Sequence, residues 1–327
     1  MSSNSAVSLS APTPSRISIP ASSFGIVLGM AGLANCWKVA HTLWGTGEVI
    51  YHTLFGLTAV LWAILLSGYA AKWIFCRVEA RAEAGHPIGC CFIGLIPVAT
   101  LLVAVWISGE LPVLGRTLIV SAVIAQLAFS TVRAGGMLRG GRELSNTTAV
   151  MYLPTVAGNF VSAIALSAAG WTDAGKMFFG AGLFSWFALE SVITYRLYLG
   201  EELPKAIRPT LGIQLAPPVV AAVAYLAISE GTMDWPFYAL YGYGVLQFLF
   251  LARLARWFSA SGASPAFWAF SFGVTAMALG CLQAAVLAPA SVFAKGALLV
   301  FLFANLFIGG LVVMTSWLLL QNQLFRQ

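Results

Sequence analysis

The stretch SPAFWAFSFGVTAMALG, residues 264–280, places four aromatic residues among and directly ahead of a run of small ones. On a helix, with about 100° between successive residues, several small residues share one narrow face: Ala269, Gly273, Ala276 and Gly280. Phe272 lies on that same face. A helix face of small residues interrupted by one large ring is compatible with either a close helix–helix contact or the wall of a pore that the ring closes.

The composition of the whole chain places this stretch in a lipid bilayer. Of 327 residues, 60% are hydrophobic and 9% are charged, whereas a soluble domain has about 25% charged residues. The mean hydropathy is +0.88. A soluble fold of this length has too little interior to bury so much apolar surface, so we expect an all-α integral membrane protein.

Apolar stretches long enough to span the bilayer, about 20 helical residues each, recur along the chain. Ten are predicted, near 21–41, 49–74, 88–108, 112–132, 150–170, 175–198, 208–229, 236–258, 265–287 and 292–320. Barrel strands would be about half as long and would alternate in polarity. We therefore predict one membrane domain over residues 20–320.

The basic residues predict the orientation of these spans. Thirteen of the 17 lysines and arginines fall on the side that carries both termini: Arg16, Lys72, Arg77, Arg81, Arg133, Arg139, Arg142, Arg196, Lys205, Arg208, Arg253, Arg256 and Arg326. By the positive-inside rule this side is cytoplasmic. Residues 1–19 are predicted to be a disordered cytoplasmic N-terminal tail, and residues 321–327 a short cytoplasmic C-terminal tail.

The odd-numbered spans differ from the even ones. Each begins at or just after a proline: Pro20, Pro87, Pro154, Pro209 and Pro265. Further prolines inside the third and seventh spans, Pro97 and the Pro217-Pro218 pair, are expected to kink or break their helices. The proline starts recur at the length of one helical pair, which indicates five pairs.

Stripes of small residues run along the odd spans, while the even spans are rich in large apolar residues. We expect the odd helices to form an inner ring around a central pore, with the even helices outside. The candidate pore-lining residues are Gly25, Gly29, Gly32, Gly94, Pro97, Thr155, Gly158, Ser162, Gly212, Ala216, Ala269, Gly273 and Ala276. Close helix packing is the alternative explanation for any single stripe.

No pattern of catalytic residues is present, so an enzyme is not expected. The five cysteines and three histidines form no ligand-spaced cluster, and neither a metal nor a cofactor is expected. Scattered basic residues do not suggest nucleic-acid binding. Glu190 is the one acid well inside a span, where it has either a proton-linked role or a structural hydrogen-bonding role.

The predicted path carries no fixed charge, which favours passage of ions by shape and weak dipoles over tight binding. Phe272 on such a wall would act as a plug. The alternative is a core phenylalanine packed between helices.

Several segments resemble the family of bacterial tellurite-resistance proteins (TehA), C4-dicarboxylate transporters and plant slow-type anion channels. They are IPASSFGIVLGMAGLA (19–34), GLIPVATLL (94–102), YLPTVAGNFVSA (152–163), FFGAGLFSW (178–186) and FWAFSFGVTAMA (267–278). The similarity extends in order over about residues 18–320.

The resemblance implies ten helices arranged as five hairpins with quasi-five-fold symmetry, a pore in each protomer, and a homotrimer in the bacterial inner membrane. It places the family's gating phenylalanine at Phe272 and its first-helix glycine at Gly25. It also implies permeation by small monovalent anions such as chloride and nitrate. The alternative function is a proton-coupled secondary transporter of C4-dicarboxylates or tellurite-like oxyanions that uses Glu190.

Overall fold

The computed structural model describes residues 18–260 and 262–321, and within them the regular secondary structure is entirely helical. The expected all-α architecture is therefore confirmed for these residues. Almost all of the tail expected over residues 1–19, and all of the tail expected over 321–327 except Gln321, lie outside the described residues.

Nine helical segments in this part of the chain are long and apolar enough to cross a bilayer. They are Ala21–Trp44, Glu48–Phe75, Gly89–Glu110, Pro112–Met137, Ala149–Ala168, Thr172–Leu199, Lys205–Ile228, Pro265–Leu287 and Val292–Leu320. The remaining expected span, 236–258, is the shorter helix α9 (Trp235–Arg253), in which three tyrosines and Gln247 lower the hydropathy. The tenth spanning helix thus stays a prediction.

Each odd-numbered span starts with an irregular helical turn and continues as a regular α-helix. These units are η1 (Ala21–Ser23) with α1 (Phe24–Trp44), η2 (Gly89–Gly94) with α4 (Leu95–Glu110), η4 (Ala149–Met151) and η5 (Leu153–Ala157) with α6 (Gly158–Ala168), η6 (Lys205–Leu215) with α8 (Ala216–Ile228), and η7 (Pro265–Phe270) with α11 (Ser271–Leu287).

The helices of the even-numbered spans are regular, and most are longer than the α-helices of the odd-numbered spans. They are α2 (Glu48–Phe75), α5 (Pro112–Met137), α7 (Thr172–Leu199), α9 and α12 (Val292–Leu320). Short helices lie in the connections: α3 (Arg77–Gly85), η3 (Leu144–Asn146) and α10 (Ala255–Ser259).

The prolines inside the third and seventh spans do not break their helices. Pro97 and the Pro217-Pro218 pair lie in the first turns of α4 and α8, after the irregular segments η2 and η6. A proline in the first turn sacrifices no intrahelical hydrogen bond, because its missing N–H would have no partner there. The expected change in the helix thus lies just before these prolines, where each irregular segment passes into the α-helix.

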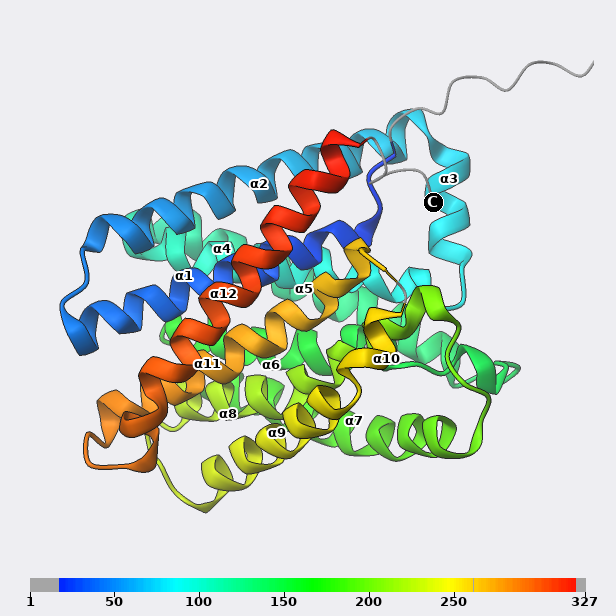
Figure 1. Ribbon diagram of the computed structural model, residues 1–327. Coiled ribbons are helices and arrows are strands. Elements are labelled where there is room, and N and C mark those ends of the chain that lie inside the picture. Colours follow the sequence, from blue (N-terminus) through cyan, green and yellow to red (C-terminus); the bar gives the residue numbers. More distant parts are fainter. Residues whose placement is uncertain (1–17, 261, 322–327) are drawn as a thin grey trace, which may run out of the picture.

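The long helices pack in two layers. Helix α1 contacts α4, α4 contacts α6, α6 contacts α8, α8 contacts α11, and α11 contacts α1, so these five inner helices form a closed ring. Each of the outer helices α2, α5, α7, α9 and α12 packs on the inner helix that precedes it in the chain. Figure 1 shows that α11 and α12 are antiparallel, as are α1 and α2.

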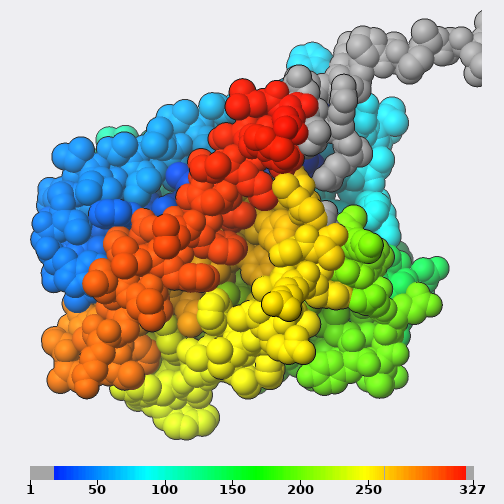
Figure 2. Space-filling view, in the orientation of Figure 1, coloured from blue at the N-terminus to red at the C-terminus, as the bar shows by residue number. Residues whose placement is uncertain are grey.

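Burial separates the two layers clearly. In the most apolar window of each inner span, 56–89% of the residues are buried, against 17–33% for the outer spans α2, α5, α7 and α12. In Figure 2 the surface on the side shown includes α2 (blue), α7 (green), α9 (yellow) and α12 (orange to red). Apolar side chains on that outer surface suit contact with lipid.

Glycines on α1 close the ring against α11. A Cβ added at Gly29 would come within 2.6 Å of the Ser271 Cβ, and one at Gly32 within 2.7 Å of the Thr275 Cβ. The Ser271 hydroxyl also donates a hydrogen bond of 3.3 Å to the carbonyl of Gly25. Such close approach of two backbones requires residues without a side chain, as in other membrane helix contacts.

Candidate functional site

Two cavities lie along the axis of the inner ring. The larger one, about 250 Å³, is bordered by the irregular turns and first helical turns of all five inner units. The smaller one, about 90 Å³, is bordered by residues further along the same five helices. The ring therefore encloses two spaces in series, one nearer the helix N-termini and one nearer their C-termini.

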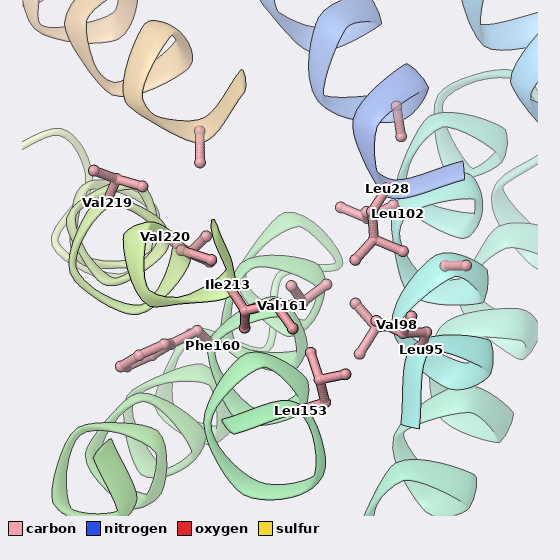
Figure 3. Close-up of a cluster of buried hydrophobic side chains, with 14 of the residues drawn as sticks. Leu28, Leu95, Val98, Leu102, Leu153, Phe160, Val161, Ile213, Val219 and Val220 are labelled. Atoms are coloured by element: carbon pink, nitrogen blue, oxygen red, sulfur yellow. The ribbon is translucent and has the colours of Figure 1, made fainter. Parts of the chain in front are cut away.

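Phe272 of α11 and Val220 of α8 are the two described residues that line both cavities. Phe272 is half-buried and Val220 is buried. Figure 3 shows Val220 extending into the space between the inner helices, toward Val161 of α6 and Leu102 of α4. The ring of Phe272 and the side chain of Val220 thus lie at the boundary between the two cavities.

The expected pore-lining residues fall into two groups in the structure: a first group that lines one of the two cavities, and a second group that lines neither. Gly25, Ala216 and Ala269 line the larger cavity, and Gly32 and Ala276 line the smaller one. The others line neither of the two: Gly29, Gly94, Pro97, Thr155, Gly158, Ser162, Gly212 and Gly273.

Most of the second group lies at close contacts between helices. Besides Gly29, a Cβ at Gly158 would meet the side chain of Gln126 on α5, and one at Gly212 would come within 2.4 Å of the Phe270 ring. A Cβ at Gly273 would come within 2.8 Å of the Leu215 Cβ. Small residues there let neighbouring helices approach each other.

The cavity-facing stripe is rotated from the small-residue stripe, and it carries larger side chains. Along η7 and α11 it comprises Ala269, Phe272, Ala276, Leu279 and Gln283, which follow one another at intervals of three or four residues. The pattern that begins at Phe272, read with helical spacing, would have identified Leu279 and Gln283. No such signal marked the cavity residues on α6.

No charged side chain is among the described residues that line the two cavities. The larger cavity is bordered instead by the N-terminal turns of five inner helices that all run in the same direction. Each helix N-terminus carries a partial positive charge of about half an elementary charge, which favours anions. The electrostatics of the larger cavity therefore favour a small anion without holding it by an ion pair.

Glu190 of α7 lies outside both cavities and accepts four hydrogen bonds. The Tyr152 hydroxyl (2.6 Å) and the Trp186 indole N–H (2.8 Å) donate to its Oε2. The Tyr243 hydroxyl (2.9 Å) and the Gln247 amide (3.3 Å) donate to its Oε1. The carboxylate thereby links α7 to α9 and to the turn before α6.

Comparison with known proteins finds, over most of the chain, the family that the segments quoted in the sequence analysis resemble. The model of the SLAC1 family, described as voltage-dependent anion channel, matches residues 18–317. A tellurite resistance protein TehA homolog of Haemophilus influenzae is 37% identical over 311 residues, covering 94% of this chain and 93% of that protein.

Plant proteins also match. The S-type anion channel SLAH2 of Arabidopsis thaliana is 26% identical over 83% of this chain, and the guard cell S-type anion channel SLAC1 is 24% identical over 84%. The chain spans about half the length of these plant relatives, 53% and 51%. The extent of the family match and the identity to the bacterial relative together show that this chain belongs to the SLAC1 family, described as voltage-dependent anion channel.

Proposed function

We propose that this protein is an anion channel that passes small monovalent anions, such as chloride and nitrate, along the axis of its inner ring. The observation that carries the proposal is the position of Phe272 at the boundary between two cavities in series. The family description and the printed names of the plant relatives support the anion as the permeating species.

The walls support a channel more than a tight-binding carrier. A site that holds a charged substrate usually supplies a fixed partner charge at membrane depth. Uncharged walls and converging helix N-termini attract an anion weakly, so it can also leave. Selectivity would then depend on how readily an anion loses its water.

Phe272 is the proposed gate. Its ring lies at the boundary between the cavities together with Val220, and the described residues that line the two cavities include no charged side chain to stabilise an ion there. An apolar constriction excludes water and ions until the ring moves. The proposed lining residues are those at the cavities: Gly25, Ala216, Ala269, Gly32 and Ala276.

The proposal includes a membrane arrangement of ten helices as five hairpins with quasi-five-fold symmetry. Helix α9 supplies the tenth span, because its 19 residues rise about 28 Å, close to the thickness of the hydrocarbon core. The excess of basic residues on one side supports a cytoplasmic position for both termini. The family resemblance adds a homotrimer in the bacterial inner membrane, with one path in each protomer.

Flux into liposomes tests the channel against the proton-coupled carrier. The protein with Phe272→Ala should admit chloride and nitrate down their gradients, with a rate that rises in proportion to concentration and needs no pH gradient. A carrier would instead show saturable uptake that a pH gradient drives and that Glu190→Gln abolishes. Four hydrogen bonds on Glu190 favour its structural role.

A further inference from the structure

Two arginines converge on one backbone carbonyl near the C-terminal end of α5. Arg133 of α5 donates from Nη2 to the Pro87 carbonyl at 3.2 Å, and Arg142, in the connection after α5, donates from Nη1 to the same oxygen at 2.9 Å. The two donating nitrogens are therefore within about 6 Å of each other. Pro87 is exposed and both arginines are half-buried, so this point is open to the surface of the protein.

Neither guanidinium group has an acidic partner within residues 18–260 and 262–321. The ion pairs in this part of the chain include neither Arg133 nor Arg142. The carboxylate of Glu143, the next residue after Arg142, accepts a hydrogen bond from the Ser145 hydroxyl instead. Two positive charges this close repel each other, and an anion that lies between them removes the repulsion.

The two guanidinium groups also hold unpaired hydrogen-bond donors. A guanidinium group carries five N–H donors, and the Nε of Arg133 and the Nε of Arg142 are both buried without a hydrogen-bond partner. Arg142 donates in addition to the carbonyl of Asn146, so the oxygens that these arginines contact in the described residues are uncharged. Unpaired charged donors require an acceptor, and a phosphate group supplies several negatively charged oxygens at once.

The surroundings of the pair favour a phosphate that belongs to a lipid headgroup. Val132, beside Arg133, is 78% exposed, and Leu138, in the connection to Arg142, is 89% exposed. Exposed apolar side chains next to arginines are expected where the hydrocarbon meets the headgroups. In the proposed topology this end of α5 lies at the cytoplasmic surface, where anionic lipids attract basic residues.

We propose that Arg133 and Arg142 form a binding site for a phosphate group, supplied by an anionic lipid headgroup or by a soluble phosphate. The phosphate accepts hydrogen bonds from both guanidinium groups and neutralises their charge. Arginine suits this role because its planar group matches two phosphate oxygens. The two arginines line neither cavity, so the site goes beyond the proposed channel function and does not depend on it.

The test measures lipid binding to the protein in an uncharged detergent by native mass spectrometry. The unsubstituted protein should bind phosphatidylglycerol, which is anionic, more tightly than phosphatidylcholine, which is zwitterionic. Arg133→Gln and Arg142→Gln should each weaken phosphatidylglycerol binding about tenfold or more, the ratio that corresponds to the loss of one charged hydrogen bond. Arg139→Gln is the matched control, because it removes one positive charge from an exposed position in the same connection and should leave binding unchanged.

Inorganic phosphate distinguishes the two sources of the ligand. Phosphate that displaces phosphatidylglycerol, and whose own binding both glutamine variants weaken, would identify a soluble phosphate as sufficient. Phosphatidylglycerol that phosphate does not displace would identify the lipid. Displacement by chloride as effective as that by phosphate would overturn the assignment of a phosphate group.

Three further results would overturn the site. They are equal affinity for the two lipids without binding of inorganic phosphate, unchanged affinity in both glutamine variants, and an equal loss in Arg139→Gln. If the glutamine variants do not fold, Arg133→Lys and Arg142→Lys decide. They keep the charge but cannot form the paired hydrogen bonds of arginine, so they should also weaken binding, and native affinity in both would overturn the site.

Discussion

Phe272 of α11 and Val220 of α8 line both cavities of the inner ring, so the boundary between the cavities is built from side chains of two neighbouring inner helices. Two consequences follow for the proposed gate. Replacing Phe272 by a small residue should join the cavities. A large side chain introduced on α8 at Val220 should separate them again.

The first prediction concerns that exchange of bulk. In Phe272→Ala, the added substitution Val220→Phe should reduce the anion current to near that of the unsubstituted protein, because a ring from α8 fills the space left on α11. Current is measured at equal amounts of protein in the membrane. Val219→Phe is the comparison, since Val219 packs against Gly244 of α9 and lines neither cavity. Equal block by both substitutions would show a general packing effect.

The second prediction concerns the contact between α1 and α11. Gly32→Ala should destabilise the protein by about 1–3 kcal/mol, the usual cost of overpacking, because the added methyl would overlap the Thr275 side chain. Adding Thr275→Ala should restore part of the stability. Thermal unfolding in detergent measures both effects.

Gly56→Ala on α2 provides the control, because a Cβ there would make no new contact within 4 Å among the described residues. A loss at Gly56 equal to that at Gly32 would contradict the close contact. So would a double variant that is no more stable than Gly32→Ala alone.

The third prediction concerns Glu190. In the Phe272→Ala background, Glu190→Gln should lower the melting temperature while anion current persists, because the carboxylate links α7, α9 and the turn before α6 but lines neither cavity. A hydrogen bond to a charged group contributes about 1.5–3 kcal/mol. Loss of current at full stability would instead favour a proton-linked role.

The fourth prediction concerns the entry to α1. Lys72 and Glu83 form an ion pair of 2.9 Å whose side chains are 5% and 14% exposed. The Ala21 N–H donates to Glu83 Oε1 at 2.8 Å, and Lys72 donates to the Ile19 carbonyl. The pair therefore anchors the turn that borders the larger cavity.

Lys72→Met alone should destabilise the protein by about 3–5 kcal/mol, because it leaves a buried carboxylate without its partner. The double variant Lys72→Met, Glu83→Gln should be more stable than this single variant. Hydrogen exchange of the Ala21 amide should accelerate in Lys72→Met. Exchange as slow as in the native protein would show that the pair does not hold this turn.

The sequence predicted the two-layer arrangement better than it predicted the cavity face. Proline starts and bulky even spans indicated which helices lie inside, and burial agrees for the nine segments. The small-residue stripes located helix contacts, as at Gly273 against Leu215, more often than cavity walls. A glycine serves either purpose, and only the three-dimensional packing shows which.

The turns before the inner helices were beyond sequence reasoning for a related reason. Prolines such as Pro97 mark a place where the backbone changes, but a proline is compatible with the first turn of a regular helix. The irregular segment lies before it, where glycine and small residues permit tight turns. Leu279 and Gln283 were missed because the lining residues were chosen from the small-residue stripe and not from the helical spacing that begins at Phe272.

The most direct test of the proposed channel is the anion current of Phe272→Ala beside the unsubstituted protein, with chloride and nitrate in the bath and equal amounts of protein in the membrane. We expect a large current in the variant alone, with a reversal potential that follows the anion gradient. Currents that do not differ between the two proteins would contradict the assignment of Phe272 as the gate.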